Sequence, residues 1–130
     1  MRQPALWLLA AMVTCWVAGF DIIYALQDVD VDRRLGHHSV PARLGARGAL
    51  RISRVLHAAS LGCLVAVAAI DRRFGALFGA AVVVVGLLLL YEHLTVSRWG
   101  TTRMALAFFT LNGAISCLLG LLGVTDVLLR

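Results

Sequence analysis

The sequence predicts an all-α protein, a polytopic transmembrane bundle of about four spanning helices. Hydrophobic residues make up 61% of its 130 residues and charged residues only 15%. A soluble domain is about half apolar and one-quarter charged, so this composition excludes a soluble enzyme. Four uncharged stretches of 16 to 22 residues approach the ~20 residues that a helix needs to cross a bilayer.

The four expected spans cover about residues 3–26, 51–70, 74–92 and 104–126 of one transmembrane domain, 1–130. The first begins like a signal peptide, but it runs into acidic residues without a small-residue cleavage site. The second reaches full length only if Arg51 and Arg54 extend their side chains to the membrane interface. The third contains a nearly pure Val and Leu run, typical of a lipid-facing helix. The four spans together are expected to leave no room among these residues for a separate soluble domain.

The charges between the spans indicate a lipid bilayer as partner and no nucleic acid. All 12 cations are arginines, and they lie between apolar runs rather than on one polar face. Two alternate inter-span segments hold most of them, and cytoplasmic segments carry such an excess. Residues 28–50 are therefore expected to form a cytoplasmic motif loop of a multi-pass protein, most simply in a bacterial inner or plasma membrane. His57, Glu92 and His93 lie near span ends and are expected to anchor the interface.

An acidic segment begins at the end of the first span and continues past it, and it is expected to carry the chemistry. Asp21, Tyr24, Asp28 and Asp32 are spaced +3, +4 and +4, which places them on one face of a continuous helix, whereas Asp30 points elsewhere. Three carboxylates on one face repel each other unless a cation lies between them. Mg²⁺ typically accepts one or two carboxylates together with substrate phosphates. The spacing therefore suggests a magnesium site at the membrane surface.

Arg33 and Arg34 follow the carboxylates and supply donors that pair with phosphate. Acids, metal and arginines together suggest a diphosphate site, and the alternative is an exposed helix end of mixed charge. An EF-hand loop starting at Asp28 fails, because it needs glycine and glutamate where the chain has Arg33 and Ser39. Assignment to the CDP-alcohol phosphotransferases also fails, because the DGxxAR element of that family is missing from the sequence.

These residues resemble the second aspartate-rich motif of the UbiA family of intramembrane aromatic prenyltransferases. The resemblance rests on one run: Asp21-x-x-Tyr24-Ala25-x-x-Asp28-x-x-x-Asp32, Arg34-x-Gly36-x-x-Ser39 and Gly45. The segment GFDIIYALQD is most similar to the 4-hydroxybenzoate polyprenyltransferase branch of the family. Residues 107–123 resemble the last helix of that branch. Family members have about nine spans and a first motif of the type NxxxDxxxD. The chain therefore resembles the C-terminal half only, or half of a UbiA-type fold.

The resemblance implies Mg²⁺ as cofactor, with Asp28 and Asp32 as metal ligands. It implies catalytic roles for Asp21, Tyr24 and Arg34. The implied reaction is transfer of a polyprenyl group from polyprenyl diphosphate to 4-hydroxybenzoate, in ubiquinone or menaquinone biosynthesis.

Substrate binding is expected from Arg33, Arg34 and Ser39. The implied partners are polyprenyl diphosphate, an aromatic acid acceptor, and either a missing N-terminal half or a second copy of the chain. The alternative is an inactive fragment or a small membrane interaction protein, because the first aspartate-rich motif is absent.

Overall fold

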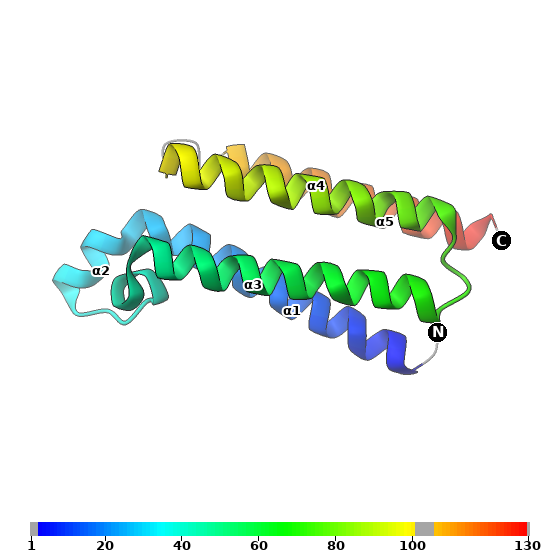
Figure 1. The fold of residues 1–130 in the computed structure, drawn as a ribbon, viewed down its shortest axis with the longest axis horizontal. Helices are drawn as coiled ribbons and strands as arrows, with labels where there is room; N and C mark the ends of the chain where they lie inside the picture. The colour runs from blue at the N-terminus through cyan, green and yellow to red at the C-terminus, as the bar shows by residue number, and fades with distance from the viewer. Residues whose placement is uncertain (1–2, 101–105, 130) are drawn as a thin grey trace.

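The computed structural model describes residues 3–100 and 106–129, and these residues form helices and turns without a strand. The predicted all-α class is therefore confirmed. Four long helices form the bundle: α1 (Gln3–Ala25), α3 (Val40–Ile70), α4 (Ala76–Trp99) and α5 (Asn112–Leu128). In Figure 1 they run along one long axis, with α1 packed on α3, α3 beside α4, and α4 on α5.

Three short helical segments complete the described chain. A 3₁₀ turn, η1 (Leu26–Asp28), and α2 (Val29–Leu35) follow α1, and a π-helical segment, η3 (Leu106–Leu111), precedes α5. Residues 28–50, expected as a loop, are thus mainly helical. The first residues of the expected fourth span, 104 and 105, lie outside the described residues.

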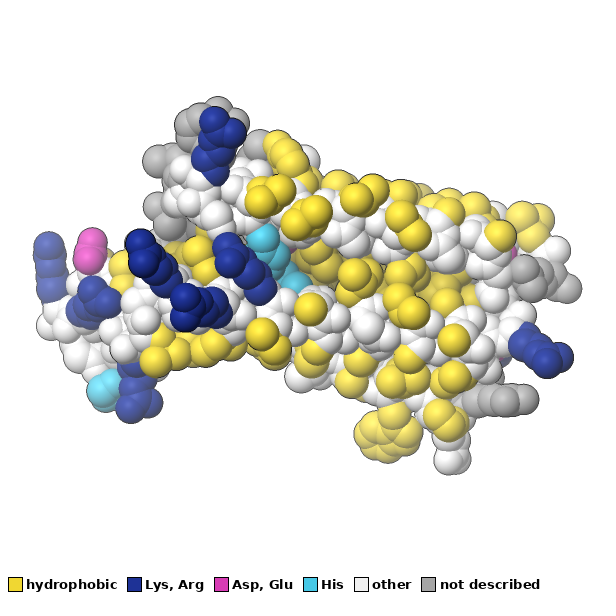
Figure 2. Space-filling view, in the orientation of Figure 1, with side chains coloured by type: hydrophobic (Ala, Val, Ile, Leu, Met, Phe, Trp, Pro, Cys, Tyr) yellow, Lys and Arg dark blue, Asp and Glu magenta, His cyan; other side chains and the backbone are white. Residues whose placement is uncertain are grey.

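Four helical stretches are long and apolar enough to cross a membrane: Gln3–Leu35, Val40–Ile70, Ala76–Arg98 and Phe109–Leu128. In Figure 1, α2 and the end of α4 lie at one end of the bundle, and both chain termini lie at the other. Figure 2 shows most arginines over the α2 end and apolar side chains over the remaining length. The two segments expected on one side of the membrane therefore do share an end.

Two buried apolar clusters hold the helices together. The larger one draws on all four long helices and includes Phe20, Leu64, Phe78, Val85 and Ile115. The smaller one lies toward the α2 end and comprises Ile23, Leu26, Ala49, Val96 and Leu111. Lipid tails are as apolar as these side chains, so close packing rather than water exclusion drives helix association here. The smaller cluster fixes the end of α1, from which the acidic segment continues.

A tight turn and a distant carboxylate define the start of α4. In the turn, the Arg73 guanidinium donates to both carboxylate oxygens of Asp71, one of them at 2.8 Å. The carboxylate of Asp126, near the end of α5, accepts hydrogen bonds from the backbone N–H groups of Gly75 and Phe78. The first N–H groups of a helix have no partner within the helix, so Asp126 caps α4 from another element.

Candidate functional site

The acidic segment begins on α1 and continues through η1 into α2. Asp21 and Asp28 are exposed, and Tyr24 is 44% exposed. The 3₁₀ turn η1 advances about 120° per residue instead of 100°, so its three residues add about 60° of rotation. The uninterrupted helical register expected from Asp21 to Asp32 is therefore broken. The carboxylates still lie in one segment of the chain, at the α2 end of the bundle.

A histidine accompanies one of the predicted metal ligands. The Nδ1 atom of His37 lies 3.4 Å from Oδ1 of Asp32. This contact forms because α2 ends at Gly36, whose φ of 72° lets the chain turn back, and the His37 N–H then donates to the Asp32 carbonyl at 2.8 Å.

Two predicted substrate-binding residues take part in local structure. Ser39 is the N-cap of α3, and its hydroxyl accepts a hydrogen bond from the Ala42 N–H at 3.2 Å. The Arg33 Nε–H donates to the Ala42 carbonyl at 3.2 Å. The Arg33 bond thus joins α2 to the start of α3, which Ser39 caps. Arg34 is exposed on α2, so its guanidinium remains accessible to an anion.

The start of α3 is bent by a second glycine. Gly45 has φ 73° and ψ 172°, a backbone conformation that side chains rarely permit, and the helix is interrupted there. The first turns of α3 therefore change direction next to α2. This bend keeps Ser39 and the acidic segment together at one end of the bundle.

The donor set fits Mg²⁺ only in part. Asp28 stands before α2 without capping it, and its carboxylate is exposed. Over 3–100 and 106–129, no three His, Cys, Asp or Glu side chains lie close enough to hold a metal ion together. One or two carboxylates are nevertheless what Mg²⁺ commonly takes from a protein when phosphates supply further ligands. Asp28 and Asp32 can thus form part of a site but not a complete protein cage.

A row of polar side chains on α3 joins this helix to α1. The Ser53 hydroxyl donates to the Gly19 carbonyl at 2.8 Å, and the Ser60 hydroxyl donates to the Met12 carbonyl at 3.0 Å. Between them, Nε2 of His57 lies 3.2 Å from the carbonyl oxygen of Trp16. We call Ser53, His57 and Ser60 the polar row. Each member is at most 3% exposed, so the row fixes the position of α1 two residues before Asp21.

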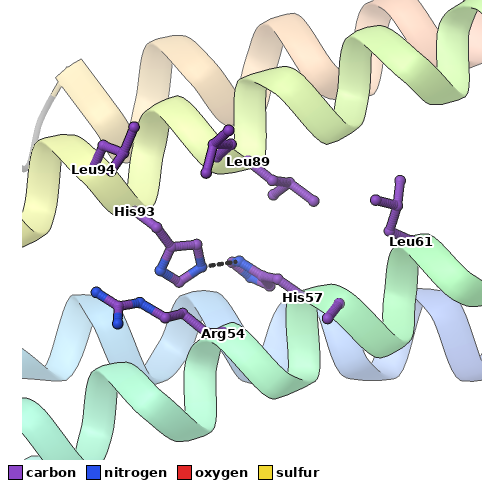
Figure 3. Close-up of a pocket in the computed structure, with 8 residues that line it drawn as sticks. Arg54, His57, Leu61, Leu89, His93 and Leu94 are labelled. Atoms are coloured by element: carbon purple, nitrogen blue, oxygen red, sulfur yellow. Dashed lines mark hydrogen bonds between the residues drawn. The ribbon is translucent and has the colours of Figure 1, made fainter.

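His57 also bridges to α4. Its Nδ1 lies 2.9 Å from Nε2 of His93, and Figure 3 shows the two rings next to each other between the helices, where their planes are inclined by 69°. A carbonyl only accepts, so the bond to Trp16 assigns the proton of neutral His57 to Nε2. Its Nδ1 then accepts from the Nε2–H of His93. This assignment leaves Nδ1 of His93 as a buried acceptor, and the described residues give it no donor.

The structure buries three residues that were expected at the membrane interface. His57 is 3%, His93 7% and Glu92 0% exposed, so their predicted role as interface anchors is wrong. Neither carboxylate oxygen of Glu92 has a hydrogen-bond partner among the described residues. The sequence did contain a pattern that points to a polar face on α3. The +4 and +3 spacing of Ser53, His57 and Ser60 puts three polar groups on one side of the helix.

A known structure has the same arrangement of helices. The apo structure of a UbiA homolog from Aeropyrum pernix K1 superposes with a TM-score of 0.80 at 32% sequence identity. The match covers 92% of this chain and 42% of that one, so this chain spans less than half the length of the homolog.

Sequence comparison agrees with the structural match. No curated protein sequence matched significantly. The model of the UbiA prenyltransferase family matches residues 2–114, which include every predicted site residue, the first three expected spans and about half of the fourth. Four helices able to span a bilayer accompany this match, which makes the protein a multi-pass membrane protein. The chain therefore belongs to the UbiA prenyltransferase family.

Proposed function

We propose that the chain forms part of an intramembrane aromatic prenyltransferase, which transfers a polyprenyl group from polyprenyl diphosphate to 4-hydroxybenzoate in quinone biosynthesis. The observation that carries this proposal is the acidic segment at the end of a membrane helix in a chain of this family. Acids at a membrane edge are costly and are typically retained for function. The choice of 4-hydroxybenzoate as acceptor rests on the resemblance of residues 19–28 to the 4-hydroxybenzoate branch of the family.

The proposed roles follow from position along the acidic segment. Asp28 and Asp32 would hold Mg²⁺ by one carboxylate each, and His37 would orient the carboxylate of Asp32. Mg²⁺, when bound, neutralises charge on the departing diphosphate. Arg34, with its exposed guanidinium, would pair with phosphate oxygens. Asp21 would orient the site by holding water at its exposed carboxylate.

The apolar groups around the segment exclude water from the reaction. Tyr24 lies one turn after Asp21 and presents its ring at the surface of α1, where an isoprenoid chain can pack. Ile23 and Leu26 are buried beneath it. A carbocation formed from the donor would survive long enough to react with the electron-rich ring carbon only if water is kept away.

A second set of ligands must complete this site. Among the described residues, no three His, Cys, Asp or Glu side chains lie close enough to hold a metal ion together, and the chain spans 42% of the homolog. We propose that the set comes from outside these 130 residues, either from an N-terminal half with a first aspartate-rich motif or from another copy of the chain. The competing proposal, favoured by the same shortage of ligands, is a non-catalytic membrane protein.

The test is prenyl transfer measured in native membranes with radiolabelled 4-hydroxybenzoate. Asp28→Asn and Asp32→Asn should each abolish Mg²⁺-dependent transfer while leaving membrane insertion intact. Asp30→Asn is the matched control in the same segment and should have little effect. Equal losses from all three variants would contradict the assigned roles. If Mg²⁺-dependent transfer is no faster than in membranes that lack the chain, the non-catalytic alternative is favoured.

A further inference from the structure

A groove separates α3 from α4, apart from the acidic segment. Its volume is about 410 Å³, within the range of small-ligand sites. Figure 3 shows side chains from both helices around it. It is lined chiefly by Arg54, His57 and Ala58 of α3 and by Leu90, His93 and Leu94 of α4.

The outer rim of the groove is apolar and exposed. Leu90 is 56% and Leu94 59% exposed, and Ala58 opposite them is also exposed. All three lie within helices that are long and apolar enough to span a membrane. The apolar walls of the groove therefore suit an acyl chain.

The groove has one formal charge at one end. The Arg54 guanidinium donates one hydrogen bond to the Ser97 hydroxyl at 2.6 Å, and a guanidinium has five donors in all. His57 and His93 are both buried within helices long and apolar enough to span a membrane, and such burial favours the neutral form of each ring. No carboxylate lines the groove. A groove with one cation at its end and apolar walls along its length is complementary to an amphiphile with one negative charge.

We propose that this groove binds an anionic phospholipid, with its phosphodiester on Arg54 and an acyl chain along Leu90 and Leu94. A phosphodiester has one negative charge, which Arg54 balances. A prenyl diphosphate has more charge and would need further cations or a metal, which the groove-lining residues do not supply. Basic sites between membrane helices commonly bind anionic headgroups, so the chemistry has a general basis. The proposal does not depend on the proposed prenyl transfer.

The decisive experiment compares two arginines on the same helix. Phosphatidylglycerol and phosphatidylcholine are titrated into the protein purified in detergent, and bound lipid is counted by native mass spectrometry. Wild type should bind phosphatidylglycerol at least tenfold more tightly than phosphatidylcholine, and Arg54→Gln should remove this preference. Arg51→Gln removes the same charge at an exposed position outside the groove. It should weaken binding by about fivefold at most, the effect of one nearby surface charge.

A second pair of variants tests the apolar part. Ala58→Trp should fill the groove from its exposed rim and weaken binding of both lipids at least tenfold. Ala59→Trp places the same ring at the next exposed position, outside the groove, and should leave binding unchanged. Both positions are exposed, so neither variant disturbs the core, and thermal unfolding checks this.

Several results would overturn the proposal. Equal losses in Arg51→Gln and Arg54→Gln would show that general surface charge attracts the lipid. Equal behaviour of the two tryptophan variants would show that the groove takes no acyl chain. Displacement of phosphatidylglycerol by an equimolar amount of geranylgeranyl diphosphate without Mg²⁺ would assign the groove to an isoprenoid diphosphate instead.

Discussion

Replacing Gly19 by alanine tests how the polar row positions the helix that leads into the acidic segment. A Cβ atom at Gly19 would lie 2.3 Å from Cδ2 and 2.4 Å from Nε2 of His57. Real atoms do not approach so closely, so the imidazole must move. The ring is held between Trp16 and His93, and its movement breaks both contacts.

The magnitude follows from three contributions. Overpacking a tight interface costs about 1–3 kcal/mol. Two interhelical hydrogen bonds in a membrane protein contribute about 0.6 kcal/mol each. Alanine favours the helix over glycine by about 1 kcal/mol, which offsets part of the loss. The free energy of unfolding should therefore fall by about 1–3 kcal/mol.

The assay is unfolding of the protein in detergent micelles by sodium dodecyl sulfate, followed by tryptophan fluorescence. Gly62→Ala is the matched control, because a Cβ at this helical glycine meets nothing within 4 Å. That variant should be unchanged or more stable by up to about 1 kcal/mol. In a His57→Ala background, Gly19→Ala should no longer destabilise. The same loss with and without the imidazole would refute the steric explanation.

Other side-chain contacts lead to further predictions. Ser53→Ala should lower the free energy of unfolding by about 0.6 kcal/mol, with about 1.7 as the upper bound, and Thr14→Val, whose hydroxyl bonds only within α1, is its control in the same titration. Asp126→Asn should cost about 1 kcal/mol by weakening the cap of α4, and amide hydrogen exchange should accelerate at Gly75 and Phe78 but not in the middle of α3. The Arg73 guanidinium, through its hydrogen bond, lowers the pKa of Asp71 from 3.8 to about 2. The folded state thus favours ionised Asp71, so this stabilisation is complete above about pH 4 and is lost as the pH falls through 2. An NMR titration of the Asp71 carboxyl should show its pKa rising in Arg73→Gln, and an unchanged pKa would contradict the assignment.

Much of the fold was predictable because span length is a strict requirement. Each apolar run had to cross the bilayer as a helix, and the arrangement of ends then followed from alternation along the chain. The 3₁₀ turn at Leu26–Asp28 was not predictable, since the residues there have no strong preference against an ordinary helix. Its effect was to break the expected helical register of the acidic segment.

The polar interior was harder to predict for a different reason. In α4 nearly every residue before Tyr91 is apolar, so periodicity does not distinguish the buried face from the lipid face. Glu92 and His93 then look like residues at the end of a span, although both are buried. In α3 the spacing of the polar row did indicate that its three side chains share one face of the helix. Their partners are carbonyl groups of another helix, α1, and a local sequence pattern cannot identify those partners.

The cap that Asp126 provides for α4 has a consequence for the order of biogenesis. Asp126 follows Gly75 by 51 residues, so α4 is synthesised before its cap exists. Until α5 is in place, the first N–H groups of α4 need water or lipid headgroups as temporary partners. The hairpin of α3 and α4 therefore lacks this cap until α5 packs against it. Folding of α5 onto α4 supplies the cap, so α5 stabilises the start of α4 as well as spanning the membrane.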